Sequence, residues 1–266
     1  LMLVETGLGD QGTLHIAGAL LINNTLQRLA LQHNKVGDGG AYYLAGALRE
    51  NTCLMELYLA HNNLAEVAMG YLGACLPECH HLRKLSLADN ALGALGAEKL
   101  AHGWALNKSL REVNLYRTGL GDAGINHVAN VLKVHRALAT LELGYNDVSA
   151  DGTEMLAAAL QQKQVLKQLG LGYNRVGDYG AQVLAGVMRE RQVLSRLTLD
   201  YNGITDAGIK QLLLAAETCS GLLELNLAGN TCQTPSLLAA IARLLHSNSK
   251  RHDVVLPVEL APVDSK

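Results

Sequence analysis

The sequence predicts an α/β solenoid, a right-handed horseshoe in which a parallel β-sheet lines the concave side and α-helices cover the convex side. One apolar pattern returns every 28 positions without a slip, and each copy holds a short alternating stretch followed by a helical one. The chain has 266 residues, 49% of them hydrophobic, yet only 4% are aromatic and none is Phe. Stacked small units with aliphatic cores explain these observations together.

The repeat has the pattern L-x-x-L-x-L-x-x-N, in which x is any residue. The first leucine of each copy is Leu26, Leu54, Leu82, Leu110, Leu138, Leu166, Leu194 or Leu222. The closing asparagines are Asn34, Asn62, Asn90, Asn146, Asn174, Asn202 and Asn230, and Thr118 takes this place in the fourth copy. Eight copies in one phase define the fold by themselves.

Each copy divides into a strand and a helix. The L-x-L core alternates with a period of two, which predicts a short strand with one buried face. Leu and Ala then recur at i, i+3 and i+4, as over residues 41–48 and 155–160, which predicts amphipathic helices of about three turns. In the turns before them, aspartates such as Asp38 and Asp122 are expected at the helix N-cap.

This pattern is identified as the leucine-rich repeat, and its 28-residue period with a helical second half resembles the ribonuclease-inhibitor-like subfamily. That subfamily also occurs in NOD-like receptors and Ran GTPase-activating proteins. The resemblance covers nearly the whole chain and implies a leucine-rich-repeat solenoid with an asparagine ladder inside it. We expect this ladder to be weaker at Thr118. The fold hosts several functions, so function needs a separate argument.

The repeat phase also predicts the domain organisation. Residues 1–249 form the solenoid, with about nine repeats of which the first is truncated, and residues 250–266 form a C-terminal capping strand and tail. The chain begins inside a predicted strand with no polar cap. We therefore expect the natural protein to extend further towards the N-terminus, or another domain to cover this apolar edge.

Composition narrows the classes of partner. The formal net charge is -2, from 22 basic and 24 acidic residues spread along the chain, so nucleic acid is not an expected partner. No apolar run reaches the roughly 18 to 20 residues of a membrane span. The five cysteines are odd in number and irregularly spaced, which favours reduced thiols and a cytoplasmic location.

The concave face is the candidate binding surface. The column just before the asparagine is His33, His61, Asp89, Arg117, Tyr145, Tyr173, Tyr201 and Gly229. We expect partner binding by Tyr116, Arg117, Glu142, Tyr145, Tyr173, Asp200 and Tyr201, because Tyr and Arg dominate binding hot spots. The small residues Gly144, Gly170, Gly172 and Thr198 would form a shelf for a partner side chain. The alternative is that the tyrosines only stack on one another and shield the sheet.

Two groups of residues have the chemistry of metal ligands. His33, His61 and Asp89 share one column, but a solvated polar face is favoured because ladder spacing is set by the sheet. The stretch Cys75 to His81 contains two cysteines and two histidines, and packed free thiols beside an exposed histidine pair are favoured there. The sequence shows no nucleophile elbow and no phosphate loop, so no metal, cofactor or catalytic residue is predicted.

The leading functional hypothesis is a non-enzymatic module that binds a protein of unknown identity on its concave face, as the leucine-rich-repeat part of a larger receptor or scaffold. The alternative is a regulator of a small GTPase, which the resemblance to Ran GTPase-activating proteins suggests. The acidic C-terminal tail of that family is absent. Ribonuclease inhibition ranks lower, because the dense cysteines and alternating repeat lengths of that family are missing.

Overall fold

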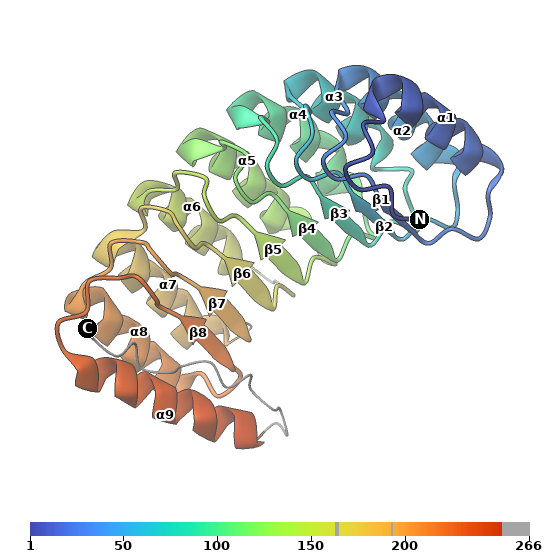
Figure 1. Cartoon of the computed structure of the whole chain (residues 1–266). Coiled ribbons are helices and arrows are strands. Elements are labelled where there is room, and N and C mark those ends of the chain that lie inside the picture. The colour runs from blue at the N-terminus through green and yellow to red at the C-terminus, as the bar shows by residue number, and fades with distance from the viewer. Residues whose placement is uncertain (163–164, 193, 252–266) are drawn as a thin grey trace.

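A computed structural model describes residues 1–162, 165–192 and 194–251, and within them eight strands and nine helices alternate along the chain (Figure 1). The strands are β1 (Arg28–Ala30), β2 (Glu56–Tyr58), β3 (Lys84–Ser86), β4 (Glu112–Asn114), β5 (Thr140–Glu142), β6 (Gln168–Gly170), β7 (Arg196–Thr198) and β8 (Glu224–Asn226). The helices are α1 (Gly9–Ile22), α2 (Asp38–Glu50), α3 (Glu66–Cys75), α4 (Gly93–Leu106), α5 (Gly121–Val134), α6 (Ala150–Leu160), α7 (Gly177–Arg191), α8 (Asp206–Thr218) and α9 (Pro235–Arg251).

The elements form the predicted α/β leucine-rich-repeat solenoid. The strands make one parallel sheet in the order β1 to β8 on the inner side of the arc, and the helices follow one another along its outer side (Figure 1). Each strand residue pairs with the residue 28 positions later, for example Leu29 with Leu57. None of the helices in the described part of the chain combines the length and apolarity needed to cross a bilayer.

Aliphatic side chains fill the space between sheet and helices. The repeat leucines, such as Leu57 and Leu59, are fully buried, and so are small helix residues such as Ala41. Between α3 and α4 the backbones come so close that a Cβ atom on Gly103 would overlap the Gly73 carbonyl. Small residues at such contacts leave little room for large rings, which explains the aliphatic core.

The asparagine ladder ties each repeat to the one before it. The Asn90 Oδ1 accepts hydrogen bonds from the Asn62 and Leu64 backbone N–H groups at 3.2 and 3.1 Å, and its Nδ2 donates to the Leu59 carbonyl at 2.9 Å. The Thr118 hydroxyl instead donates to the Leu115 carbonyl and to Asn146. In the described chain no backbone N–H of the third repeat donates to the Thr118 side chain, so the expected weak point is confirmed.

The prediction that the turn aspartates are N-caps is wrong. Asp38 and Asp122 lie inside the first turn of their helices, and Gly37 and Leu120 occupy the N-cap positions. Each carboxylate reaches the start of the next helix instead, as when Asp122 accepts hydrogen bonds from the Ser149 backbone N–H and hydroxyl. The aspartates thus form a second ladder, because helix starts of stacked repeats lie side by side and share unpaired N–H groups.

A third ladder joins the loops that follow the helices. The Asn107 Oδ1 accepts from the backbone N–H groups of Ser109 and Leu110, while its Nδ2 donates to the Leu76 and Cys79 carbonyls of the previous repeat. His135 occupies this position in the next repeat. Its Nδ1 accepts from the backbone of residues 137 and 138, but its buried Nε2 has no partner among the described residues.

The two ends of the solenoid differ from the repeats between them. Residues 1–3 run beside β1 through a single parallel bridge between Met2 and Ala30. At the other end the predicted boundary between residues 249 and 250 falls inside α9, which continues to Arg251. The capping strand and tail predicted for residues 250–266 lie outside the described residues from 252 onwards.

We expect the Leu143→Ala substitution to lower the free energy of unfolding by about 2 to 5 kcal/mol, because it leaves a cavity between stacked repeats. Leu143 is fully buried. The matched control is Leu95→Ala on α4, where the leucine is 46% exposed and little change is expected. Urea denaturation measures both, and equal midpoints for the two variants would contradict the inward orientation of Leu143.

His135 makes stability depend on pH. Burial, assisted by the charges of Arg111 and Arg136, lowers the pKa of His135 from 6.5 to about 4. The folded state therefore binds this proton less readily than the unfolded state, and stability present above pH 6.5 is lost as the pH falls towards 4. The His135→Asn variant should lose less stability over this window, by at most about 1.4 kcal/mol per pH unit. Parallel urea-denaturation profiles for the two proteins between pH 8 and pH 4.5 would contradict this.

Candidate interaction surface on the concave face

The column before the ladder asparagine leaves the sheet just after each strand ends. His33, His61, Asp89, Arg117, Tyr145, Tyr173 and Tyr201 all have left-handed backbone, with φ between 50 and 57°. The chain already turns towards the next helix at these residues. The sequence signal for this turn was Gly229 in the same column, because glycine readily adopts positive φ; its φ is 69°.

Four tyrosines, Tyr116, Tyr145, Tyr173 and Tyr201, form a continuous tyrosine ledge. The rings of Tyr145 and Tyr173 stack with centroids 4.3 Å apart, and those of Tyr173 and Tyr201 stack at 4.4 Å. The Tyr116 ring meets Tyr145 edge-on at 5.3 Å. The three stacked residues remain 38 to 52% exposed. The tyrosines therefore do stack on one another, and part of their aromatic surface still remains exposed for a partner.

The predicted glycine shelf is wrong, because the protein's own side chains fill it. A Cβ atom on Gly144 would lie 2.8 Å from the Tyr116 ring, and one on Gly172 would lie 2.6 Å from the Asp200 carboxylate. The Glu142 carboxylate covers Gly170 in the same way. Each covering side chain occupies the same column in an adjacent repeat, and it lies over the glycine because no Cβ atom excludes it. The glycines thus position Tyr116, Glu142 and Asp200 rather than receive a partner.

Two carboxylates lie beside the tyrosine ledge. Burial raises the pKa of Glu142, with the positive charge of Arg196 opposing the shift and the charge of Asp200 adding to it. The Asp200 carboxylate accepts a hydrogen bond from the Asn226 side chain at 3.1 Å. Burial and the neighbouring ring of Tyr145 raise the pKa of Tyr116, which keeps that hydroxyl protonated. This part of the surface combines aromatic faces with negative charge, a combination that attracts cations.

The other half of the column is polar and internally paired. The rings of His33 and His61 stack at 4.1 Å, and the Nε2 of His61 lies 3.0 Å from Asp89. The Nε of Arg117 lies 3.0 Å from the other oxygen of Asp89. Arg117 is thereby drawn towards the polar half, whereas Tyr116, Glu142, Tyr145, Tyr173, Asp200 and Tyr201 lie together.

The cysteine and histidine stretch contains packed thiols, as predicted. Cys75 and Cys79 are buried with their Sγ atoms 3.8 Å apart, and the Cys79 thiol donates to the Cys75 carbonyl at 3.1 Å. A hydrogen bond with Cys79 and burial raise the pKa of Cys75. His80 and His81 are exposed. Across the described residues, no group of three or more His, Cys, Asp or Glu side chains is arranged to hold a metal ion.

The sequence analysis did not predict a column of charges at the first position of six of the eight strands, all except β5 and β6. Arg28 pairs with Glu56 at 2.5 Å, and the Tyr58 hydroxyl donates to the same carboxylate at 2.7 Å. The other pairs in this column are Lys84 with Glu112 at 2.7 Å and Arg196 with Glu224 at 2.5 Å. The sequence contains the signal for these ion pairs, because residues of opposite charge stand 28 positions apart in it. Ion pairs this exposed contribute little stability, so they mainly set the charge of the concave face.

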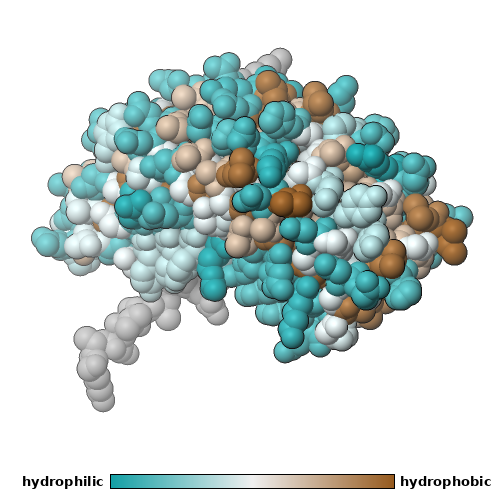
Figure 2. Space-filling view, turned by 90° about the horizontal axis from the view of Figure 1, so that it is seen from above, coloured by the Kyte–Doolittle hydropathy of each residue, from teal (hydrophilic) through white to brown (hydrophobic). Residues whose placement is uncertain are grey.

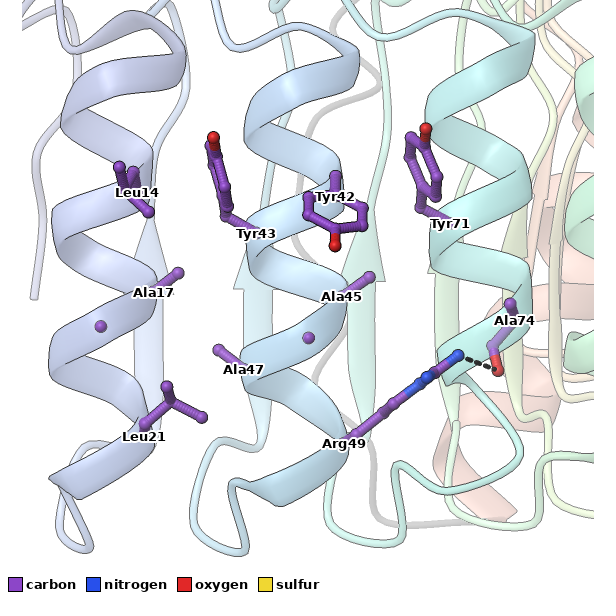
Figure 3. Close-up of a pocket in the computed structure, with 12 residues that line it drawn as sticks. Leu14, Ala17, Leu21, Tyr42, Tyr43, Ala45, Ala47, Arg49, Tyr71 and Ala74 are labelled. Carbon is purple, nitrogen blue, oxygen red and sulfur yellow. Dashed lines mark hydrogen bonds between the residues drawn. The ribbon is translucent and has the colours of Figure 1, made fainter.

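The convex face is largely hydrophilic, with hydrophobic residues in small separate patches in the view of Figure 2. One groove of about 430 Å³ lies between α1, α2 and α3, lined by Leu14, Leu21, Tyr42, Tyr43 and Tyr71 among others (Figure 3). Its charged lining residue, Arg49, reaches the Ala74 carbonyl at 3.4 Å. The groove brings together apolar side chains and no pair of groups suited to acid–base or nucleophilic chemistry.

Comparisons with known proteins find similarity to leucine-rich-repeat sequences over two short segments. A family profile described as "Leucine Rich repeat" matches residues 23–45 and 78–101. A search of curated protein sequences finds no significant match. Among solved structures, the chain is similar to actin-binding site 2 of leiomodin-1, with 14% identity, a TM-score of 0.49 and coverage of 53% of this chain and 82% of that one. It is also similar to internalin C2 from Listeria monocytogenes, with 21% identity, a TM-score of 0.48 and coverage of 82% and 74%.

The burial of Glu142 has a measurable consequence. The pKa of Glu142 is raised in the folded state, so the folded protein holds this proton more tightly than the unfolded chain does. The stability of the wild type is therefore complete below the ordinary pKa of 4.5 and falls as the pH rises through the raised value. We expect Glu142→Gln to be more stable than the wild type at pH 7 and equal to it near pH 3.

Thermal melts across this pH range measure the difference, because the titrations of all other groups cancel between the two proteins. Glu112→Gln is the control, since Glu112 is more exposed and pairs with Lys84. A pH-independent difference for Glu142→Gln, or a wild type that is the more stable protein at pH 7, would contradict the burial of this carboxylate.

Proposed function

We propose that this leucine-rich-repeat solenoid is a non-enzymatic interaction module that binds a protein partner through the tyrosine ledge. The observation that carries the proposal is the run of three stacked tyrosines that remain 38 to 52% exposed. Exposed aromatic rings gathered on one surface are typical of binding sites. In this proposal the repeats are of the ribonuclease-inhibitor-like type. The solenoid is the leucine-rich-repeat part of a larger cytoplasmic receptor or scaffold.

Preorganisation supports the binding role. The rings of Tyr145 and Tyr173 are each held between two other rings of the ledge. The Tyr201 ring, at one end, lies over Gly229, where a Cβ atom would approach it to 2.5 Å. Side chains that are already ordered lose little conformational entropy when a partner docks. Tyr also offers a large apolar face with a polar tip, which suits a surface that is wet when free and covered when bound.

The chemistry beside the ledge indicates what part of a partner it receives. Beyond the effect of burial, the charge of Asp200 acts on Tyr116 and helps to raise the pKa of its hydroxyl, and the charges of Asp200 and Glu142 act on each other. A Lys or Arg side chain of the partner would gain both an ion pair and a cation–π contact there. The proposed docking element is therefore a basic residue flanked by apolar ones.

A binding role also fits the fact that potentially reactive side chains are already paired with other groups of the protein. His61 is paired with Asp89, Arg117 is held by the same carboxylate, and the buried Cys79 thiol donates to a backbone carbonyl. Nucleophilic catalysis needs a nucleophile next to a free base in an accessible cleft. The functional groups on this face are instead arranged side by side along the sheet, as a contact surface requires.

The Tyr173→Ala variant tests the ledge at its centre. Removing this ring should weaken partner binding by about 2 kcal/mol or more, roughly 30-fold in the dissociation constant, because central aromatic residues dominate such interfaces. The partner is first captured with the wild-type chain and then titrated against each variant, with the melting temperature measured in parallel. The matched control is Gln182→Ala, at an exposed position of helix α7.

The stacking contacts of Tyr173 contribute about 1 kcal/mol to stability, so only a small drop in melting temperature is expected. The Gln182→Ala variant should bind and melt like the wild type. Unchanged binding by Tyr173→Ala would show that the ledge only shields the sheet. A loss of binding that merely follows unfolding would lead to the same conclusion.

A further inference from the structure

We propose a second binding site on a different face, where the loops after α3, α4 and α5 enter the sheet, and that it receives a phosphorylated segment of a protein. The basic edge that forms it consists of His80, Arg83, Lys108, Ser109, Arg111 and Arg136. These residues line two adjoining cavities. The site is independent of the tyrosine ledge, because it lies at the opposite ends of the strands.

The two cavities share a wall. The first has a volume of about 410 Å³ and is lined by His80, Arg83, Lys108, Ser109 and Arg111. The second, of about 440 Å³, is lined by Lys108 and Arg111 as well, together with Arg136 and the buried His135. Lys108 and Arg111 therefore face both cavities. A single phosphate group has room in either, with space left for its flanking chain.

The repeat register assembles the cluster. His80, Lys108 and Arg136 are separated by 28 positions and occupy one column, and Arg83 and Arg111 occupy another. The Arg111 backbone N–H donates to the Arg83 carbonyl at 2.7 Å, which places the two arginines side by side just before β4 and β3. All four arginine and lysine side chains in the two columns are exposed. Two short rows of basic groups thus run side by side.

These positive charges lack the partners that cations have on the concave face. Arg28, Lys84 and Arg196 each pair with a glutamate there. Among the described residues no carboxylate lies within ion-pair distance of Arg83, Lys108, Arg111 or Arg136. The nearby Glu112 is held by Lys84. Like charges gathered this closely repel one another, and a bound dianion would relieve that repulsion.

His135, in the wall of the second cavity, senses the positive charges around it. The Nδ1 of His135 accepts from the Ala137 and Leu138 backbone N–H groups, so the neutral ring carries its proton on Nε2. This Nε2 is buried and has no acceptor among the described residues. An unpaired buried donor is costly, but this Nε2 is closed off from solvent and therefore also from a ligand in the open cavity. The low pKa of His135, partly caused by Arg111 and Arg136, agrees with a positive field here.

Phosphate fits these groups better than a carboxylate does. It brings close to two negative charges and three acceptor oxygens, and guanidinium groups bind such oxygens with two parallel hydrogen bonds. Arg83 and Arg111 supply two guanidinium groups, and Lys108 supplies a third cation between the cavities. The Ser109 hydroxyl already donates its proton to the Cys79 carbonyl at 2.6 Å. It can therefore accept hydrogen bonds but has no proton left to donate to a phosphate. The recognition is therefore carried by the cations.

The test uses the whole chain and four probes, with binding followed by calorimetry at 50 and 200 mM salt. The probes are a heptapeptide of alanines with a central phosphoserine, the same peptide with Ser or Glu at its centre, and inorganic phosphate. The phosphopeptide should bind at least tenfold more tightly than the Ser and Glu peptides, and more weakly at 200 mM salt. Inorganic phosphate should compete with it.

Two variants locate the site. Arg83→Gln combined with Lys108→Gln should reduce phosphopeptide affinity at least tenfold with an unchanged melting temperature, since both side chains are exposed. Lys210→Gln on α8, another exposed cation, should bind like the wild type. The proposal is overturned if the phosphopeptide binds no better than the Ser or Glu peptide, or if Lys210→Gln weakens binding as much as the double variant.

Two further outcomes would also overturn it. A single-stranded oligonucleotide that binds as tightly as the phosphopeptide would show a general polyanion surface. Lys108 and Arg136 follow the C-terminal ends of α4 and α5, where cations stabilise a helix. If the double variant melts at a lower temperature and the wild type binds no probe, these residues serve helix stability alone.

Discussion

The structure depends on one constraint: a single strand with its helix cannot bury its own apolar face, so every repeat must be covered by its neighbours. Parallel pairing in a constant 28-residue register satisfies this constraint, as in the pairing of Leu29 with Leu57 and of Leu57 with Leu85. The same register converts each position of the repeat into a column of adjacent side chains. Core, ladders and surfaces are therefore all consequences of one period, and a change at one position acts mainly on the two neighbouring repeats.

Three hydrogen-bond ladders hold the stack in addition to the core. Asparagines such as Asn90 act at the ends of the strands, aspartates such as Asp122 at the helix starts, and Asn107 and its counterparts in the loops after the helices. Each satisfies backbone groups that neither strand nor helix can pair, which is necessary where the chain turns between buried elements. Thr118 and His135 interrupt two of the ladders, and both leave polar backbone or side-chain groups without a partner in the described chain.

Columns also explain why the surfaces differ from one another. Where a column alternates in sign, as with Arg28 and Glu56, the charges neutralise each other locally. Where a column repeats one kind of residue, it forms a continuous surface of one character. The stacked rings from Tyr145 to Tyr201 form an aromatic surface, and the row from His80 to Arg136 forms a basic one. Stability does not require such accumulation, since side chains at these positions are exposed and the leucine core is complete without them. Accumulated aromatic surface and accumulated charge are the features of this solenoid that fit molecular recognition.

The sequence by itself determined the solenoid, its register, the strand and helix segments and the weak point at Thr118, because these follow from a local pattern repeated without error. It also identified the tyrosine column, since residues 28 positions apart must be neighbours in such a stack. Only the tertiary structure decided how side chains share space across repeats. It placed Tyr116, Glu142 and Asp200 over glycines, directed the Asp122 carboxylate to the start of the next helix, and paired Arg117 with Asp89. These outcomes depend on distances between side chains of different repeats, for which the one-dimensional period contains no information.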